Sequence, residues 1–513
     1  MPSLWIAQNP LQPYPTLDND QSCDLLVVGS GIAGLSSAYE AARSGADVIV
    51  IDRGEISGGM TARTTAHLAS EIDDYYSELI DVVGEDRARL YHQSQVAAID
   101  RIEAICREEA IDADFKRLPG YLVAACSEDQ SRLEKERDAC RLLGVKVEWA
   151  DSSPVALPPG TKALRFAGQA RMHPLKYTAG LAEAIKRRGG RLYARTAYME
   201  HEEAGGRVRI VTDSGRAIDA AAVLFATNSP VNDRVKVHTK QVPMRTYAIA
   251  GKIDSGSAED ALVWDTLEAY HYVRLQPAGE GKDWLIVGGE DHRSGTANDM
   301  DDRFARLEAW AKQRFDVDAF EYRWSGQVME PVDFLPYSGR DGSDSIYLHS
   351  GDSGQGMTNG VAGALNFIAL YEGKSRFADL FEPARKPTHA SSLAEYVKGQ
   401  GPVVANLAEY LGPGEVASPE AIKPGEGAIL RRGTAKHAVY RAEDGTIVER
   451  SAVCTHVGCI VHWNSFEKCW DCPCHGSQFK PDGTVLNGPA TRPLALVDQS
   501  ASGAPAQQVE TAT

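Results

Sequence analysis

Short apolar runs and a helical pattern follow one another near the N-terminus. Residues 24–28 and 48–52 are dominated by apolar side chains, and residues 35–43 between them have the pattern of a helix. Apolar runs of this length are typical of buried parallel strands, and a helix between two such runs is typical of a crossover connection. We therefore predict a βαβ unit over residues 24–52.

Strand-like patterns recur in the remainder of the chain. Residues 223–228 form another apolar run, residues 270–274 alternate polar and apolar side chains, and residues 285–292 are a candidate neighbouring strand. Short strand-like runs at residues 438–441 and 446–448 lie among turns rich in glycine and proline. These patterns predict a large α/β part followed by a small all-β domain.

The first predicted strand leads into a G-x-G-x-x-G segment formed by Gly29, Gly31 and Gly34. Such glycines provide a tight turn, close approach of the backbone to a pyrophosphate, and close helix–strand packing. Asp52 ends the second strand, where it is placed to bind a ribose hydroxyl. The motif predicts an adenine dinucleotide but does not separate FAD from NAD. The expected contacts in this unit are Gly29, Gly31, Ile32, Ala33, Gly34, Asp52 and Arg53.

Two short segments near the C-terminus combine cysteine with histidine. Cys454 is followed by His456, and Cys472 is followed by His475. Each segment can give a thiolate to one iron and an imidazole to the other, which is the arrangement of a Rieske [2Fe–2S] centre. The same donors would also satisfy a Cys2His2 zinc site. Zinc fingers normally place their histidines on a helix, whereas both segments here lie in turns punctuated by glycine and proline, so we favour the iron–sulfur cluster.

The C-terminal part resembles the Rieske domain, both in these segments and in Trp470-Asp471 and Gly488-Pro489-Ala490. The resemblance implies that the inner iron is held by Cys454 and Cys472, that the outer iron is held by His456 and His475, and that Cys459 and Cys474 form a disulfide between the loops. Cys469 has no assigned role and is expected to be a half-buried spare thiol.

The N-terminal part resembles the D-amino-acid oxidase and glycine oxidase superfamily of FAD-dependent oxidoreductases. The matching segments are residues 172–175, 223–228, 333–339 and 347–360. This resemblance implies FAD, a Rossmann-type α/β FAD-binding domain, an interleaved α+β substrate domain, and a glycine-rich turn whose helix dipole favours an anionic reduced flavin. The alternative for that turn is an ordinary strand–helix connection. Further expected FAD contacts are Arg63, Thr64, Thr65, His67, Ala226, Thr227, Gly354, Gly356, Met357 and Thr358.

Candidate substrate residues lie in the alternating run at residues 270–274. In the resembling family such a strand covers the reactive face of the flavin, so Tyr272 and Arg274 are candidates for binding a substrate carboxylate, the arginine bidentately. The alternative is an arginine with a structural partner and tyrosines that pack the sheet. His67 faintly resembles the histidine that joins flavin covalently in some relatives, but its spacing does not match cleanly, so noncovalent FAD is expected.

The chain has 513 residues with 43% hydrophobic content, which suits two or three globular domains. We expect an FAD-dependent oxidoreductase over residues 1–385, with a substrate subdomain at about 75–165 and 235–330, a connecting helix and linker over 386–425, a Rieske domain over 426–500, and a tail over 501–513. The helix of the linker region is expected between residues 391 and 410.

Charge and hydropathy exclude several classes of partner. The formal net charge is −17 and no basic run is present, which argues against nucleic acid and anionic membrane surfaces. We expect no membrane span, because no window approaches 18 uninterrupted apolar residues. The N-terminus lacks the basic start and apolar core of a secretory signal, so a cytoplasmic protein is expected.

Together these features predict an FAD-dependent dehydrogenase that oxidises a carbon–nitrogen bond of a small-molecule amine or amino acid. The fused Rieske cluster would then pass electrons one at a time to an external electron acceptor. Two alternatives stay open. One is a flavin oxidase that uses O2 directly, and the other is an electron-transfer protein that serves an oxygenase or a quinone. A reductase with a second nucleotide-binding domain is disfavoured, because no second complete glycine motif is present.

Overall fold

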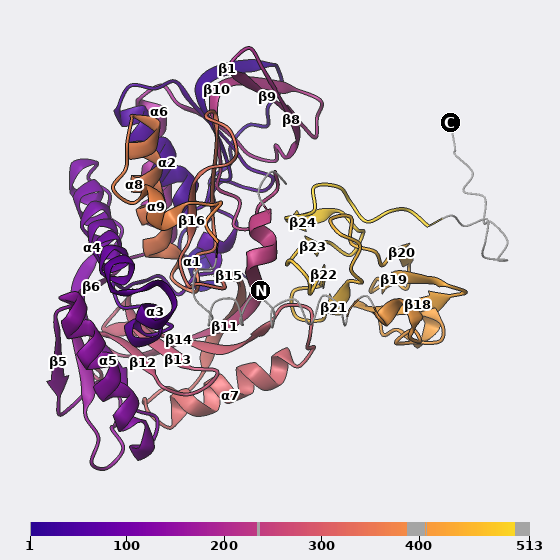
Figure 1. The fold of residues 1–513 in the computed structure, drawn as a ribbon. Helices are drawn as coiled ribbons and strands as arrows, with labels where there is room; N and C mark the ends of the chain where they lie inside the picture. The colour runs from indigo at the N-terminus through magenta and orange to yellow at the C-terminus, as the bar shows by residue number, and fades with distance from the viewer. Residues whose placement is uncertain (1, 233–235, 387–405, 407, 498–513) are drawn as a thin grey trace.

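The computed structural model describes residues 2–232, 236–386, 406 and 408–497. The ribbon in Figure 1 shows a large N-terminal body built on two sheets and a smaller C-terminal domain beside it. Most of the predicted helix at residues 391–410, and the whole predicted tail over residues 501–513, fall outside the described residues. Among the described residues, the helices are all too short or too polar to cross a membrane.

The first sheet contains the predicted βαβ unit. Strand β1 pairs in parallel with β2 and with β10, which brings Val28 opposite both Ile51 and Phe225. The described strands of this sheet are β1 (Gln21–Val28), β2 (Val48–Ile51), β7 (Arg191–Tyr193), β8 (Tyr198–Ala204), β9 (Arg207–Thr212), β10 (Ala217–Phe225), β16 (Tyr337–Arg340) and β17 (Ile346–Ser350). The central strands are buried on both faces, which explains their continuous apolar sequences.

Helices cover this sheet through close, small-residue contacts. Helix α2 (Ile32–Arg43) packs against α6 (Pro174–Arg187) and α8 (Gly356–Tyr371). A Cβ atom at Gly360 of α8 would lie 2.9 Å from the Ile32 side chain, so only glycine allows this helix spacing. The N-terminus of α2, which carries the glycine motif, is thereby held beside the N-terminus of α8.

The second sheet lies below the first and carries the alternating run. Strands β13 and β14 pair in antiparallel fashion with Tyr272 opposite Gly288, which confirms the predicted neighbours. The described strands are β3 (His67–Leu68), β4 (Lys116–Val123), β5 (Val147–Ala150), β6 (Ala163–Arg171), β11 (Gln241–Asp254), β12 (Leu262–Asp265), β13 (His271–Gly279), β14 (Lys282–Arg293) and β15 (Phe320–Pro331). One face packs Val273 and Val287 against Phe304 of helix α7.

The remaining helices surround the second sheet and the edge of the first. They are α1 (Leu4–Gln8), α3 (Tyr76–Val83), α4 (Glu85–Glu108), α5 (Gln130–Leu143), α7 (Met300–Lys312) and α9 (Ala378–Phe381). Glu136 of α5 accepts hydrogen bonds from the backbone amides of Tyr76 and Ser77, at 2.8 and 2.9 Å. This buried carboxylate therefore satisfies the free amides at the start of α3.

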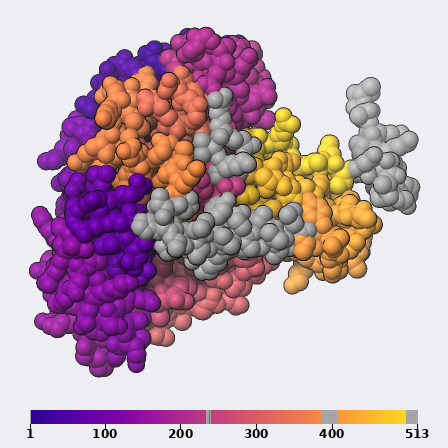
Figure 2. Space-filling view, viewed as in Figure 1, coloured from indigo at the N-terminus to yellow at the C-terminus, as the bar shows by residue number. Residues whose placement is uncertain are grey.

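The C-terminal domain is all-β over its described residues 426–497, as predicted. One sheet contains β18 (Glu426–Arg432), β19 (Ala435–Arg441) and β20 (Ile447–Ser451), and the other contains β21 (His462–Asn464), β22 (Cys469–Asp471), β23 (Gln478–Phe479) and β24 (Val485–Asn487). Trp463 and Trp470 meet edge to face at 4.9 Å in its core. Figure 2 shows this domain as a yellow and orange lobe against the larger body.

Charged contacts join the lobe to the body. The Arg245 side chain of β11 is 2% exposed, and its Nη2 lies 3.1 Å from the carboxylate of Asp471, which is 3% exposed. Arg63 pairs with Glu467 at 2.7 Å, and Ser325 Oγ donates to the same carboxylate at 2.6 Å. Burial alone would raise the pKa of Glu467, but the guanidiniums of Arg63 and Arg245 lower it below its usual range. Opposite charges therefore meet across a largely dry domain interface.

Replacing Arg245 tests the importance of this interface. Arg245→Met should leave the Asp471 carboxylate buried without its cation, and we expect a loss of about 3–5 kcal/mol in the free energy of unfolding. Lys282→Met is a matched control, because Lys282 pairs with Asp254 on the exposed surface and its loss should change little. The measurement is chemical denaturation of both variants. Equal stability of the two variants would contradict the expectation.

Candidate functional site

A cavity of about 340 Å³ lies between the two sheets and brings the predicted FAD residues together. Its wall includes the glycine turn, the segment after β2, the ends of β10 and β15, and the turn before α8. The sequence-predicted residues on this wall are Gly29, Gly31, Ile32, Ala33, Asp52, Arg53, Arg63, Thr64, Thr65, His67, Ala226, Thr227, Tyr272, Gly354, Gly356 and Met357. Gly34, Thr358 and Arg274 are not part of it.

The three motif glycines serve different purposes. Gly29 has a φ of +106°, and a Cβ atom there would collide with the carbonyl of Ala226, the residue after β10. A Cβ atom at Gly34 would collide with the carbonyl of Gly29. Gly31 instead has an ordinary φ of −68°, and its Cβ would meet only Thr61 Oγ1, at 3.2 Å. The space beside Gly31 therefore belongs to the cavity, which fits a backbone that must approach a pyrophosphate.

Asp52 lies on the cavity wall, but its carboxylate also organises the glycine turn. Oδ2 accepts hydrogen bonds from the backbone amide of Ser30 at 2.8 Å and from its hydroxyl at 2.6 Å, while Oδ1 accepts from the amide of Gly54 at 2.8 Å. These contacts tie the end of β2 to the turn after β1. Binding of a ribose hydroxyl by Asp52 stays a prediction.

His67 faces the cavity as a neutral imidazole. Burial, reinforced by the positive charge of Arg274, lowers the pKa of His67 to about 3. Its Nε2 lies 3.1 Å from the carbonyl of Val273, and its Nδ1 lies 3.1 Å from Thr65 Oγ1. Since the carbonyl can only accept, Nε2 carries the proton. Hydrogen bonds thus orient the ring on both sides.

The turn before α8 brings a helix N-terminus to the cavity. Gly354 has a φ of +74°, and a Cβ atom there would collide with the carboxylate of Asp73. Gln355 accepts a hydrogen bond from Tyr91 Oη at 2.9 Å and donates to the carbonyl of Glu71. Helix α8 begins at Gly356, so its partial positive charge faces this space, as the resemblance implies for a flavin site. Thr358 instead points inward and is buried.

Aromatic and acidic side chains form the wall opposite the glycine turn. Tyr272 Oη lies 2.6 Å from Thr246 Oγ1, and Tyr270 Oη donates to Asp73 Oδ2 at 3.0 Å. Asp291 of β14 lines the same wall. Burial is the main reason that the pKa values of Asp73 and Asp291 rise to about 7. Sequence reasoning missed both acids, although Asp291 lies inside the strand-like run at residues 285–292.

Arg274 does not face the cavity, and the substrate-binding role suggested for it requires correction. Its side chain is fully buried, donates to the carbonyls of Ala66 at 2.7 Å and Met172 at 2.9 Å, and lies over the ring of Trp5. The cavity extends along β13 as far as Tyr272 and no farther. Arg274 shares the face of Tyr272, but it ties together three backbone segments, so the structural alternative is favoured.

The two Cys/His segments meet within the C-terminal domain. Hydrogen bonding from the Cys472 thiol lowers the pKa of Cys454 to about 7, and the same contact, with burial, raises the pKa of Cys472. The rings of His456 and His475 lie at right angles with centroids 5.0 Å apart. Both cysteines and His475 are buried, whereas His456 is half-buried. Two adjacent thiols beside two facing imidazoles, one of them more exposed, fit a Rieske cluster.

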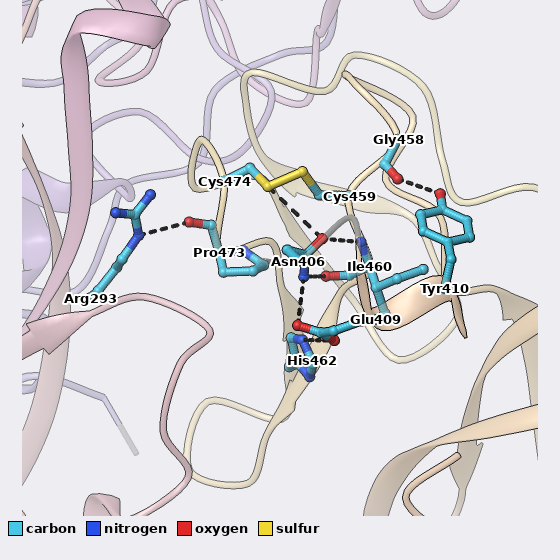
Figure 3. Close-up of a disulfide and its surroundings, with 10 residues drawn as sticks. All are labelled: Arg293, Asn406, Glu409, Tyr410, Gly458, Cys459, Ile460, His462, Pro473 and Cys474. Atoms are coloured by element: carbon cyan, nitrogen blue, oxygen red, sulfur yellow. Dashed lines mark hydrogen bonds and ion pairs between the residues drawn. A yellow bond between two sulfur atoms is a disulfide. The ribbon is translucent and has the colours of Figure 1, made fainter. Parts of the chain in front are cut away.

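Cys459 and Cys474 form a disulfide between the two loops, as the resemblance implied (Figure 3). Their sulfurs and that of Cys472 lie within 4.8 Å of one another. Because two of these sulfurs are bonded together, Cys472 is the thiol of this group that can ligate iron. Asn406 braces the first loop by accepting from the amide of Ile460 at 2.7 Å and donating to its carbonyl at 3.1 Å.

Cys469 is fully buried rather than half-buried, because β22 pairs on both sides within its sheet. Its Sγ lies 3.5 Å from Asp471 Oδ1, and Gln478 Nε2 lies 3.7 Å from the same sulfur. Burial and the nearby Asp471 carboxylate raise the pKa of Cys469 well above its usual range. Cys469 therefore contacts Asp471 and Gln478, and its contacts do not place it among the cluster ligands.

The cavity wall is completed by the C-terminal domain. Glu467, Gln478, Leu486, Asn487 and Gly488 all line it. Gln327 of β15 also lines the cavity, and its Nε2 donates to the carbonyl of Gly476, at 2.7 Å. Gly476 lies between His475 and Ser477 in the second cluster loop. One side chain thus contacts both the proposed flavin space and the loop that holds the cluster, a proximity that no local sequence signal indicated.

Comparison with known proteins agrees with this arrangement. The family described as FAD dependent oxidoreductase matches residues 24–368, and the Rieske [2Fe-2S] domain matches residues 413–498. The Rieske 2Fe-2S iron-sulfur protein YhfW of Bacillus subtilis (strain 168) is 31% identical over 507 residues, which cover 97% of each chain. These matches confirm both resemblances inferred from the sequence, and with them FAD and a Rieske [2Fe–2S] cluster as the cofactors.

Two further similarities concern the N-terminal part. Gamma-glutamylputrescine oxidoreductase of Escherichia coli (strain K12) is 28% identical over 394 residues, which cover 73% of this chain and 89% of that protein. The crystal structure of glycine oxidase from Geobacillus kaustophilus superposes with a TM-score of 0.58 at 18% identity, covering 71% of this chain and 99% of that one. The second likeness shows that the two-sheet body has the fold of glycine oxidase.

The role of Gly31 gives a test of the FAD site. Gly31→Val should fold, because φ is ordinary and only Thr61 is near, but its side chain should enter the cavity and displace FAD. We expect loss of the flavin absorbance band with retention of the Rieske spectrum, since the cluster lies in another domain. Gly31→Ala is the graded control and should retain more FAD. Full retention of FAD by Gly31→Val would contradict the assignment.

The cysteines of the second loop give a test of the ligand set. Cys472→Ser should abolish the cluster, whereas Cys469→Ser should leave it intact, because Cys469 contacts Asp471 and Gln478 instead of the cluster loops. Iron and inorganic sulfide analysis, together with the electron paramagnetic resonance spectrum of the reduced protein, measures both. Cluster loss in Cys469→Ser alone would show that the ligand set is wrong.

Proposed function

Since the chain belongs to the family of FAD-dependent oxidoreductases and ends in a Rieske [2Fe–2S] domain, we propose that it is a dehydrogenase acting on a carbon–nitrogen bond. Its donor is an amine or an amino acid, and the electrons leave through the cluster to an external acceptor. Oxidation of CH–NH to C=N releases two electrons and two protons, for which bound FAD supplies a two-electron acceptor and the cluster a one-electron carrier.

One observation carries this proposal: residues of both domains line a single cavity. Glu467 and Gln478 of the Rieske domain contribute to the wall that also contains the glycine turn. Gln327 extends from this wall to the backbone of the second cluster loop. A cluster that served an unrelated partner would gain nothing from docking at this place. The shared wall favours a relay inside one molecule, because fusion raises the effective concentration of the two centres.

Side chains of the body hold the second cluster loop in position from two directions. Gln327 donates to Gly476 on one side of His475, and Arg293 Nε donates to the carbonyl of Pro473 at 3.1 Å on the other side. A Cβ atom at Gly295 would lie 3.1 Å from the backbone nitrogen of Pro473, so the two backbones are in close contact. These contacts restrict the motion of the loop relative to the cavity, which a fast electron relay requires.

The choice of donor is supported by the cavity and by the relatives. Tyr272 and His67 offer an aromatic and neutral surface beside the proposed flavin space, suited to an uncharged amine. The relatives reported above are named for γ-glutamylputrescine and for glycine, both of which contain nitrogen that can be oxidised. A donor with a carbon–nitrogen bond is therefore the best-supported class.

Replacing one cluster ligand tests the relay. His475→Ala should remove the cluster function but leave anaerobic reduction of FAD by the donor nearly unchanged, while steady-state reduction of a one-electron acceptor should fall strongly. The donor is found first by an anaerobic screen of amines and amino acids, followed at the flavin absorbance band. His462→Ala is the matched control, because this histidine of the same domain pairs with Glu409 and Glu415 away from the cluster.

Two outcomes would redirect the proposal. Unchanged turnover of His475→Ala with stoichiometric hydrogen peroxide would mean that electrons leave directly to O2, as in an oxidase. A flavin that no amine or amino acid reduces, but that a protein partner does reduce, would indicate an electron-transfer protein instead.

A further inference from the structure

A second cavity, of about 280 Å³, adjoins the first. The two share Asp73, Trp264 and Tyr270 in their walls, so a hydrogen-bonded carboxylate and phenol separate them. We call this second space the acidic chamber. Its carboxylate side chains come from the loop after β3, from α3, and from the end of β12 and the segment that follows it. They are Glu71, Asp73, Glu78, Asp265 and Glu268.

The only cationic side chain on the described wall of the chamber is Arg132, and it already has partners. Its Nη1 donates to the carbonyl of Thr266 at 3.3 Å, and its guanidinium lies over the ring of Tyr75. Three of the five carboxylates also have partners, since Asp73 accepts from Tyr270. Asp265 accepts from the amide and the ring of His271, and Glu78 pairs with Lys135 at the surface. Carboxyl groups therefore outnumber cationic side chains on the described wall of the chamber.

Glu71 shows most clearly that this space is suited to a ligand. Its side chain is 2% exposed and lines the chamber, yet Oε2 accepts no hydrogen bond from any described residue. Burial, together with the nearby charges of Asp73, Glu136 and Asp74, raises the pKa of Glu71 well above its usual range. A buried carboxyl without a partner costs stability unless something else satisfies it.

On the wall of the main cavity, beside the proposed flavin space, acidic side chains again outnumber the cationic side chains that are available for a ligand. Asp291 Oδ1 also has no hydrogen-bond partner among the described residues. The arginines of that wall are engaged elsewhere: Arg63 and Arg245 pair with carboxylates of the Rieske domain, and Arg53 lies near Asp52 at the glycine turn. With Arg274 in the core, the described wall offers no obvious cation for a substrate carboxylate, whereas several carboxylates are available for a substrate cation.

We propose that the donor is an aliphatic diamine or polyamine whose reacting amine lies in the main cavity and whose second ammonium group enters the acidic chamber, where Glu71 binds it. This inference rests on the proposed oxidation of a carbon–nitrogen bond and specifies its substrate class. Asp73 lies between the two spaces and attracts the cation as it passes, while Trp264 and Tyr270 flank the aliphatic segment between the two nitrogens. A charge-assisted hydrogen bond to Glu71 makes the second ammonium the main determinant of affinity.

The experiment measures binding to the holoprotein by the shift in thermal unfolding temperature and by isothermal titration calorimetry under anaerobic conditions. The probes are 1,4-diaminobutane, butylamine and 4-aminobutanoate, which share a four-carbon chain but end in an ammonium, a methyl and a carboxylate group. We expect 1,4-diaminobutane, or a longer diamine of the same series, to bind about tenfold or more tightly than butylamine. 4-Aminobutanoate should bind most weakly, because its carboxylate meets the acidic wall.

Variants test whether the preference for the diamine over butylamine comes from the acidic chamber. Glu71→Gln should reduce the affinity for the diamine about tenfold and leave that for butylamine within about twofold. Glu268→Gln at the exposed rim keeps the test informative if Glu71→Gln does not fold, and it should weaken the diamine selectively. Asp81→Asn is the control, because this exposed α3 carboxylate near Lys135 does not line the chamber.

Equal affinities of wild type for butylamine and all the diamines would overturn the proposal, as would tightest binding of 4-aminobutanoate. If amino acids reduce the flavin while diamines neither bind nor react, the substrate class is wrong but the dehydrogenase function stands. If diamines bind as expected while no amine or amino acid reduces the flavin, the chamber assignment stands and the dehydrogenase function fails.

Discussion

A buried ion pair between Arg245 and Asp471 is the constraint on which the two-domain arrangement depends. Both side chains are nearly inaccessible to water in the docked arrangement, so each charge there depends on the other for its compensation. Asn464 and Gln478 donate additional hydrogen bonds to Asp471, at 2.8 and 2.6 Å, which orient its carboxylate within the Rieske domain. The second cluster loop begins at the next residue. Its position over the cavity is therefore a consequence of electrostatics in a dry interface.

The docked Rieske domain closes one side of the main cavity in the body that it covers. In isolation, the cavity proposed to hold FAD would be open along the side that Leu486, Asn487 and Gly488 now line. The opposite side of the same cavity leads into the acidic chamber through the Asp73–Tyr270 pair. In the proposed function the donor binds toward the acidic chamber and the electrons leave through the Rieske domain, so the two use different parts of the wall.

Short sequence patterns were sufficient to predict those functional features that are built from residues adjacent in the chain. The βαβ unit, the glycine turn and the Cys/His segments have short-range patterns, because a tight turn, a crossover or a two-residue ligand spacing is built from adjacent residues. It was insufficient for Arg274, since a strand pattern shows which face a side chain shares but not where a cavity along that face ends. Asp73 and Asp291 were missed for a related reason: single acids in loops and strand ends are common, and only their convergence is unusual.

The sequence by itself determined the two cofactor classes, the α/β body and the all-β C-terminal domain, because these follow from motifs and periodicities that tolerate few alternative folds. Only the tertiary structure decided that the cluster domain closes the flavin cavity, that Arg274 serves the core, and that acids from three separate segments surround an adjoining chamber. These features depend on contacts between residues hundreds of positions apart, such as Arg63 with Glu467. Their energies come from burial and charge pairing, which arise only when the chain is folded.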